Sequence, residues 1–495
     1  MNRQITRVAL VSLALLIALI VATTYWQTWA AASLADRQDN AIQRVAQFTI
    51  KRGLIYAADG KTVLARNIVR TIDGKKLFFR RYPAGSLAPH VVGYSTQSRA
   101  RAGLERSEND YLVGSNKSLR TVLRTTLDRL KGATITGNTL VTSIDPKAQA
   151  LANRLLAGQC GSAVALEPST GRVLVMASAP TYDPNLVEGH FDQFGKVRGN
   201  CKPSAPLLNR ATAGLYTPGS TFKVVTAAAA LDTGRFKADS EFVDPGYCTE
   251  YGKRVYNFAD QSGPEIFGRV TLSEALQHSI NAVFCNVGKS LGALTLIDYA
   301  KRFGFYAVPP LETPVNERAP SGLYNGTRLF RPKHGYQVDP GRFAFGQERL
   351  LVTPLQMAMV AGAIGNGGIV MRPYVVSRVV GPDHHTVSKT KPQSLGQAIK
   401  PQTAATLTDM MESVVTGGTG TAAQIPGVRV AGKTGTAETG VSHNNTTWFI
   451  SFAPADNPRV AVAVALENQT GTGGATAAPI AKQLMEELLS RKPSS

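Results

Sequence analysis

The chain has 495 residues, of which 43% are hydrophobic and 18% are charged, and its formal net charge is +20 at pH 7. This length and hydrophobic content allow two packed domains and exclude a disordered or fibrous protein. The basic residues are scattered along the chain, so we expect no nucleic-acid partner. Attraction to anionic envelope polymers or lipid headgroups is the better interpretation of the charge, and a merely solubilising surface is the alternative.

The N-terminus predicts a transmembrane helix. No charged residue occurs between Arg7 and Asp36, and the apolar part of this stretch is close to the ~20 residues that cross a bilayer. Two arginines precede it, so residues 1–7 are expected in the cytoplasm and the bulk of the chain outside the cell membrane. A cleaved signal peptide is the alternative, because alanines 30–32 offer a cleavage site. We favour a single-pass anchor over residues 8–29, because the apolar run is long for a signal peptide.

Four cysteines lie in the part predicted to be exported, where disulfides persist. They are Cys160, Cys201, Cys248 and Cys285. None has the C-x-x-C spacing of zinc ligands, so no metal site is assigned. Four cysteines allow three connectivities, and we prefer the pairing of Cys248 with Cys285.

The part after the anchor divides into two regions. Residues 36–150 carry short strand-like runs and turns, without a catalytic cluster. Residues 155–490 open with a predicted β-hairpin over 162–177 and continue with a mainly helical block from about 218 to 415. They end in three predicted strands, at residues 428–431, 447–452 and 460–466, and one predicted helix at residues 479–489. Strands from both ends of this region can form one antiparallel sheet between helices, so we expect an α/β fold.

A serine and a lysine stand one helical turn apart after a tight turn. Pro218-Gly219 precedes Ser220-Thr-Phe-Lys223, which places Ser220 at a helix N-terminus and Lys223 on the same face. A buried lysine with a lowered pKa can take the serine proton, so hydroxyl and amine are expected to touch. The pattern alone is weak, because Ser388-Lys-Thr-Lys391 matches it in a polar stretch.

Two further motifs follow in order. S-x-N occurs at Ser279-Ile-Asn281, and also at residues 107–109 and 442–444, so it means little by itself. Lys433-Thr-Gly435 occurs once, at the end of a strand-like run. There the glycine would let a substrate backbone approach the strand edge. Strand, cation and hydroxyl together suit a peptide that ends in a carboxylate.

The ordered set Ser220-x-x-Lys223, Ser279-x-Asn281 and Lys433-Thr-Gly435 resembles the signature of serine β-lactamases and penicillin-binding proteins. From residue 52 to the C-terminus, the sequence resembles class B penicillin-binding proteins. Its layout is most similar to their actinobacterial PbpA-like branch. Its further matches are Arg52-Gly-Leu-Ile55, Gly103-Leu-Glu105, Val164–Gly171, Tyr182-Asp-Pro-Asn185, Tyr216–Ser220, Gly346-Gln347, Thr353–Met357 and Gly432–Glu438. It implies the serine β-lactamase and transpeptidase fold, an antiparallel sheet sandwiched by helices, after a non-catalytic domain of the pedestal or dimerisation type.

The resemblance also implies residue roles. Ser220 would be the acyl-forming nucleophile, Lys223 its base, and Ser279 with Asn281 the proton relay and part of substrate binding. Lys433 would complete the cleft, and Thr434, Gly435 and Thr436 would bind the substrate carboxylate and backbone. The backbone N–H groups of Ser220 and Thr436 would form the oxyanion hole. No metal or cofactor is implied.

The function implied is a peptidoglycan D,D-transpeptidase. Stem peptides of glycan built from lipid II would be cross-linked through an acyl-enzyme, which β-lactams would block. No glycosyltransferase-like region precedes residue 150, so a membrane glycosyltransferase of the RodA and FtsW type is the implied partner.

Other functions are weighed against this one. Residues 427–434 match the Walker A pattern of P-loop NTPases, but β-rich sequence follows instead of a helix. A β-lactamase would need a deacylating base, for which the segment 312–316 has the wrong spacing. A β-lactam sensor and a D,D-carboxypeptidase share the motifs and stay open. His278, beside Ser279, is expected to be structural, because no G-x-S-x-G elbow surrounds Ser220.

Overall fold

The computed structural model describes residues 2–26, 48–97, 101–115, 126, 134–260, 263–438 and 444–491. Helix α1 (Asn2–Tyr25) is long and apolar enough to cross a membrane, and no part of its apolar window is buried. This helix fits a membrane anchor or a signal sequence. Alanines 30–32, the predicted cleavage site of the alternative, lie outside the described residues.

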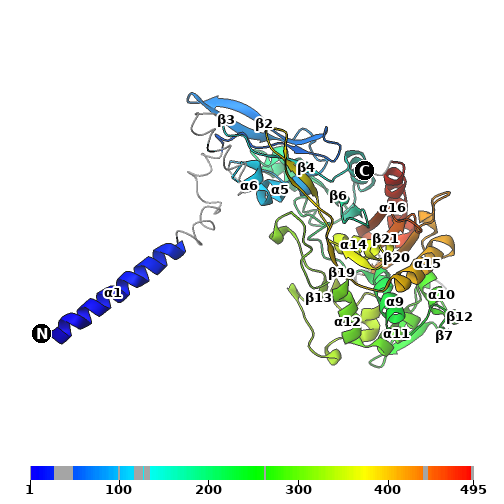
Figure 1. Cartoon of the computed structure of the whole chain (residues 1–495). Helices are drawn as coiled ribbons and strands as arrows, with labels where there is room; N and C mark the ends of the chain where they lie inside the picture. The colour runs from blue at the N-terminus through cyan, green and yellow to red at the C-terminus, as the bar shows by residue number, and fades with distance from the viewer. Residues whose placement is uncertain are drawn as a thin grey trace.

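A five-stranded sheet forms the centre of the C-terminal part (Figure 1). Its order is β20-β21-β22-β5-β6, and every pairing is antiparallel. The strands are β5 (Gly161–Leu166), β6 (Val173–Ala179), β20 (Ala431–Glu438), β21 (Asn445–Ala453) and β22 (Val460–Gln469). The predicted hairpin and the return of the chain to the sheet are thus confirmed.

Helices cover both faces of this sheet. On one side, α8 (Pro146–Leu155) and α16 (Gly473–Leu489) pack on Ala163 and Val175. On the other side, α14 (Pro354–Gly365) belongs to the cluster that contains Val164. Neighbouring residues of a strand point to opposite faces, so fully apolar strands serve two helical layers. The predicted sandwich is confirmed.

The helical block lies beyond α14. Its helices are α9 (Lys223–Asp232), α10 (Leu272–Gln277), α11 (Asn281–Leu291), α12 (Ala293–Arg302), α13 (Pro340–Ala344) and α15 (Pro401–Gly417). Thr271 caps α10 through the predicted capping box with Glu274. Short strand pairs interrupt the block, which the sequence did not predict. They are β7 (Glu241–Asp244) with β12 (Gly268–Thr271), β8 (Tyr247–Glu250) with β9 (Lys253–Tyr256), β10 (Ala259–Asp260) with β11 (Gly263–Pro264), β13 (Gly322–Asn325) with β14 (Arg328–Leu329) and β15 (Leu350–Leu351), and β16 (Ile369–Met371) with β19 (Ser394–Gln397).

A six-stranded sheet belongs to the N-terminal part, with the order β18-β17-β4-β1-β2-β3. Its strands are β1 (Ile55–Tyr56), β2 (Val63–Ile72), β3 (Lys75–Arg81), β4 (Thr139–Thr142), β17 (Val376–Val380) and β18 (Thr386–Lys389). Short helices accompany it, namely α4 (Pro89–Val92), α5 (Gly103–Ser107) and α6 (Asn109–Leu112). Because β17 pairs with β4, a segment from the later part of the chain completes the sheet of the earlier part.

Two predicted boundaries are wrong. The predicted strand 428–431 begins only at Ala431, because Val428 N–H bonds back to Ile425 and closes a turn at Gly427, whose φ is +74°. The predicted helix 479–489 begins at Gly473, where the Thr472 side chain accepts a hydrogen bond from Ala475 N–H. Pro479 therefore lies inside the helix and not in its first turn, which proline usually favours.

Both cysteine pairs are bonded. The predicted pairing of Cys248 with Cys285 is confirmed, and Cys160 is bonded to Cys201. The first disulfide joins β8 to α11, and the second joins the start of β5 to the loop after β6.

Candidate active site

The segment around Ser220 is held tightly against the loop that contains Gly346. Ser220 lies in a 3-10 turn (Gly219–Phe222) that leads directly into α9. Gly219 N–H donates to Gly346 O at 3.1 Å. Gly346 has φ +79°, and a Cβ there would lie 2.0 Å from Gly219 O, so only glycine permits this contact. The predicted position of Ser220 at a helix N-terminus is confirmed.

The turn also packs against the strand that carries the third motif. A Cβ on Gly435 would lie 2.9 Å from Pro218 O and 2.9 Å from the Thr221 side chain. The missing side chain therefore makes room for the turn that contains Ser220, whereas the sequence suggested room for a substrate backbone. This close approach places Ser220 beside β20.

Two lysines converge on Ser279. Lys223 Nζ donates to Ser279 O at 2.5 Å and to Asn281 Oδ1 at 2.8 Å, and lies 3.3 Å from Ser279 Oγ. Lys433 Nζ donates to Ser279 Oγ at 2.8 Å and to Thr434 O at 3.2 Å. The structure thus brings together residues of all three motifs, although they lie far apart in the chain.

Burial changes the protonation of both lysines, which have no exposed surface. Burial and the neighbouring charge of Lys433 lower the pKa of Lys223 well below its usual value. Burial lowers the pKa of Lys433 to about 7. Near neutral pH the pair can therefore hold a neutral amine, which is what a general base requires.

The predicted contact between Ser220 and Lys223 is not formed. Among the described residues, no hydrogen bond of the Ser220 side chain is present, while the Lys223 amine is taken up by Ser279 and Asn281. The acceptors of the amine come from the start of a second helix and from Ser279 just before it, and spacing along the chain could not reveal them. Ser220 remains partly exposed.

The remaining predicted site residues lie on β20. This strand is the first of its sheet and, within the described part of the chain, pairs in that sheet with β21 alone. Its other edge can accept an extended peptide. The Thr434 hydroxyl shares a hydrogen bond with Thr419 at 2.6 Å, and the Thr436 hydroxyl accepts from Gly473 N–H at 3.1 Å. Thr419 is a partner that no motif signalled.

The competing motif matches lie elsewhere or in the wrong structure. Ser388 is exposed on β18. Asn109 of the first S-x-N match accepts a hydrogen bond from Arg52 Nη1 at 2.8 Å, and residues 442 and 443 lie outside the described residues. The end of the Walker A match, residues 431–434, forms a strand paired with β21, so no phosphate-binding loop exists there.

Two other rejected candidates have structural partners. The His278 ring stacks on Phe267 at a centroid distance of 5.2 Å. The Glu312 carboxylate accepts a hydrogen bond from Val375 N–H at 2.8 Å, and no contact with Ser220 or Lys223 is present among the described residues. Neither arrangement supports a role as a catalytic base.

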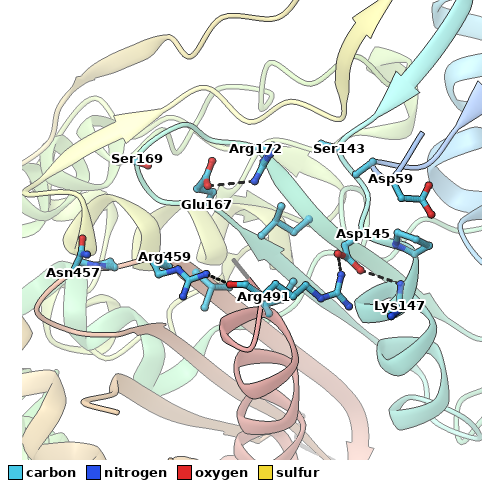
Figure 2. Close-up of a pocket in the computed structure, with 16 residues that line it drawn as sticks. Asp59, Ser143, Asp145, Lys147, Glu167, Ser169, Arg172, Asn457, Arg459 and Arg491 are labelled. Carbon is cyan, nitrogen blue, oxygen red and sulfur yellow. Dashed lines mark hydrogen bonds and ion pairs between the residues drawn. The ribbon is translucent and has the colours of Figure 1, made fainter. Parts of the chain in front are cut away.

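A cavity of about 670 Å³ lies apart from these residues (Figure 2). Its charged lining consists largely of pairs, such as Arg172 with Glu167 at 3.3 Å and Arg491 with Asp145. None of the predicted site residues lines this cavity, so it is not the active site.

Comparison with known proteins decides the family. Residues 161–486 match the penicillin binding protein transpeptidase domain, and residues 52–140 match the penicillin binding protein A dimerisation domain. The chain belongs to the penicillin-binding protein transpeptidases. The predictions of a serine-type D,D-transpeptidase and of its PbpA-like branch are confirmed at this level.

Relatives and solved structures agree over nearly the full length. The chain is 38% identical to peptidoglycan D,D-transpeptidase PbpA of Mycolicibacterium smegmatis, over 97% of this chain and 98% of that protein. It is 35% identical to PbpA of Mycobacterium tuberculosis over the whole of both chains. The ceftriaxone acyl-enzyme complex of penicillin-binding protein A from M. tuberculosis has a TM-score of 0.78 and 34% identity, covering 90% of this chain and all of that one. Its penicillin G acyl-enzyme complex has a TM-score of 0.77.

Proposed function

We propose that Ser220 is the nucleophile of peptidoglycan cross-linking and that Lys223 is its base. The observation that carries this proposal is the convergence of the buried Lys223 and Lys433 on Ser279. Lys223 begins the helix that directly follows the turn with Ser220. Neutral Lys223 would take the Ser220 proton directly or through Ser279, and Asn281 would hold the amine in place. The bond between Ser220 and Lys223 would form in the substrate complex, because catalytic hydrogen bonds often tighten when substrate binds.

The reaction would run in two balanced steps. Ser220 Oγ attacks the carbonyl carbon of the D-Ala-D-Ala bond, the C–N bond breaks, and terminal D-Ala leaves with the serine proton. An amine of a second stem peptide then attacks the ester, the C–O bond to Ser220 breaks, and the serine regains a proton. The backbone N–H groups of Ser220 and Thr436 would stabilise both tetrahedral intermediates. Lys433, Thr434, Gly435 and Thr436 would bind the substrate along β20.

The setting would be the outer face of the cell membrane. Helix α1 would be an uncleaved anchor, with residues 36–150 as a non-catalytic domain and residues 155–490 as the transpeptidase domain. Glycan strands would come from a membrane glycosyltransferase of the RodA and FtsW type. The acyl-enzyme complexes of M. tuberculosis penicillin-binding protein A support β-lactams as inhibitors of this chain.

The test is covalent labelling of the full chain in detergent with a fluorescent penicillin, followed by intact mass. One stable adduct is expected, and it should disappear in Ser220→Ala. Ser388→Ala is the matched control, because it removes the serine of the other S-x-x-K match and should leave labelling unchanged. Rapid drug hydrolysis without an adduct would instead favour a β-lactamase, and an adduct that persists in Ser220→Ala would refute the assignment.

A further inference from the structure

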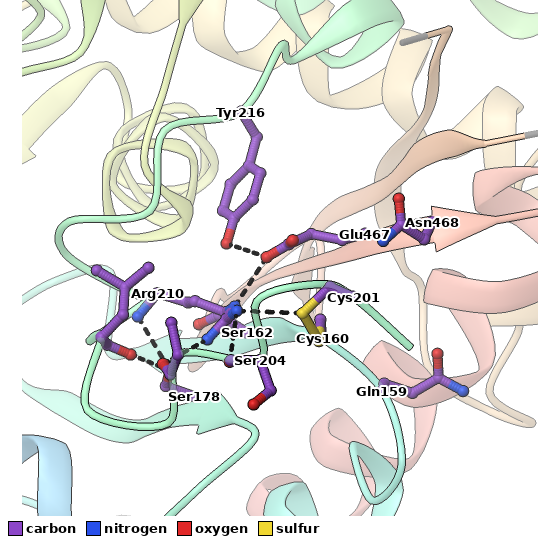
Figure 3. A network of polar contacts seen from close by, with 12 residues as sticks. Gln159, Cys160, Ser162, Ser178, Cys201, Ser204, Arg210, Tyr216, Glu467 and Asn468 are labelled. Carbon is purple, nitrogen blue, oxygen red and sulfur yellow. Dashed lines mark hydrogen bonds and ion pairs between the residues drawn. A yellow bond between two sulfur atoms is a disulfide. The ribbon is translucent and has the colours of Figure 1, made fainter. Parts of the chain in front are cut away.

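A polar network joins the segment before Ser220 to the C-terminal end of β22, the middle strand of the central sheet (Figure 3). The Tyr216 hydroxyl donates to Glu467 Oε1 at 2.8 Å, and Arg210 Nε donates to the same oxygen at 2.8 Å. Glu467 lies on β22, 251 residues from Tyr216. One carboxylate oxygen therefore holds two side chains that come from the segment leading to the nucleophile.

Glu467 is itself held firmly. Arg210 is 2% exposed, and its remaining donors reach Ala205 O, Ser204 O and Cys201 Sγ. Cys201 is bonded to Cys160, whose carbonyl accepts from Glu467 N–H at 2.8 Å. The loop closed by this disulfide thus holds Glu467 in two ways. Cys160 O accepts from the Glu467 backbone N–H, and Arg210, which is bonded to the loop, contacts the Glu467 carboxylate.

Tyr216 transmits this support to the nucleophile. Its ring lies edge-to-face with the Trp448 ring at a centroid distance of 6.1 Å. Trp448 Nε1 donates to Thr217 O at 3.0 Å, and Trp448 pairs with Gly435 across the sheet. Burial and the Glu467 charge raise the pKa of Tyr216 well above its usual value, so its hydroxyl remains a donor.

We propose that Glu467 is a positioning residue for acylation. Its carboxylate accepts a hydrogen bond from the Tyr216 hydroxyl and so fixes residues 216–219 against the sheet. This determines the position of the Ser220 N–H group relative to the Thr436 N–H group. The proposal rests on the function proposed above, in which these two groups form the oxyanion hole. Misplacement of a reacting group by about 1 Å can slow catalysis by ~100-fold. Loss of the bond between Tyr216 and Glu467 should therefore have a measurable effect on the rate.

The test separates binding from acylation by stopped-flow kinetics with a fluorescent penicillin. Tyr216→Phe keeps the ring and removes only the bond to Glu467. We expect the acylation rate constant to fall about tenfold, within the range for misplaced groups, with the dissociation constant of the preceding complex unchanged. Tyr299→Phe is the matched control, because the buried Tyr299 hydroxyl donates to the Asp232 carboxylate at 2.9 Å, at the opposite end of α9. The control should acylate at the wild-type rate.

Variants of Glu467 test the coupling. Glu467→Gln keeps an acceptor oxygen and should retain most of the rate, whereas Glu467→Ala should be as slow as Tyr216→Phe. The double variant Tyr216→Phe/Glu467→Ala should be no slower than the slower single variant, because each single variant already loses the bond between Tyr216 and Glu467. Thermal unfolding is recorded for each variant. If Glu467→Ala fails to fold with Arg210 unpaired, Tyr216→Phe alone decides.

A wild-type acylation rate in Tyr216→Phe, an equal loss in Tyr299→Phe, or additive losses in the double variant would overturn this proposal. Absence of any Ser220-dependent adduct in the wild-type chain would overturn the proposed function instead, so the two failures are distinguishable.

Discussion

Lys433 and Ser279 lie 154 residues apart in the chain, and the Lys433 amine donates to the Ser279 hydroxyl at 2.8 Å. Lys223 Nζ lies 3.3 Å from the same hydroxyl oxygen. Two amines buried around one hydroxyl oppose folding, because each has lost its water and because protonation of both would make them repel each other. The arrangement therefore serves the proposed chemistry and not stability. The opposition between folding stability and the acylation rate leads to the first two predictions.

Lys433→Met is expected to stabilise the folded chain at pH 7 while it slows acylation. The pKa of Lys433 is about 7 in the folded state and ordinary in the unfolded state, so the unfolded state binds more protons between these values. Wild-type stability should consequently rise with pH above about 7, and the variant should lose the part of this dependence that comes from Lys433. Calorimetry should show a higher Tm at pH 7, by roughly 1–2 °C for each kcal/mol in a chain of this length. A lower Tm would contradict the prediction.

If Lys223 is the base as proposed, the acylation rate should fall at acid pH, because a protonated amine cannot accept the Ser220 proton. Burial and the Lys433 charge lower the pKa of Lys223, so the wild-type rate should stay level until the pH is well below the usual range of lysine. Lys433→Met removes the neighbouring charge and should move the acidic limb of the profile to higher pH. The measurement is the acylation rate constant against pH for both proteins. A limb that does not move would mean that Lys433 does not tune Lys223.

The disulfide between Cys248 and Cys285 ties β8 to α11, the helix that begins at Asn281. Replacement of both cysteines by serine should lower the free energy of unfolding by about 2–5 kcal/mol. Urea unfolding followed by fluorescence measures the loss. As a control, addition of a reductant should destabilise the wild type but have less effect on this variant, which keeps only the Cys160–Cys201 bond. Equal stability of variant and wild type would contradict the prediction.

Glu105 is fully buried between Arg52, at 2.8 Å, and Arg80, at 2.6 Å. Burial alone would raise the pKa of Glu105, but the charges of Arg80 and Arg52 outweigh it and lower this pKa. Glu105→Ala would leave two guanidinium groups uncompensated, and we expect a loss of about 3–5 kcal/mol in the free energy of unfolding.

Glu241→Ala is the control for Glu105→Ala. It breaks an exposed pair with Arg269, whose side chains are 61% and 75% exposed, and should cost at most about 1 kcal/mol. Labelling by penicillin in the folded fraction should survive both changes, because neither carboxylate lies among the site residues. Equal losses for the two variants would show that burial of Glu105 does not matter.

Local sequence chemistry was enough to predict several features of this protein. Pro218-Gly219 placed Ser220 at the start of a helix, and Thr271 with Glu274 gave the capping box of α10. Apolar runs bounded by turns gave the hairpin of β5 and β6. These predictions held because turn geometry, capping and side-chain periodicity act between residues a few positions apart. The order of the three motifs supplied the family.

Only the tertiary structure decided which distant groups meet. It selected Ser279 and Asn281 over Ser107 and Asn109 as partners of Lys223. It also carried β17 back to β4 and placed Glu467 against Tyr216 across 251 residues. Such contacts depend on how whole layers of helices and strands pack, and the spacing of residues along the chain does not predict that packing.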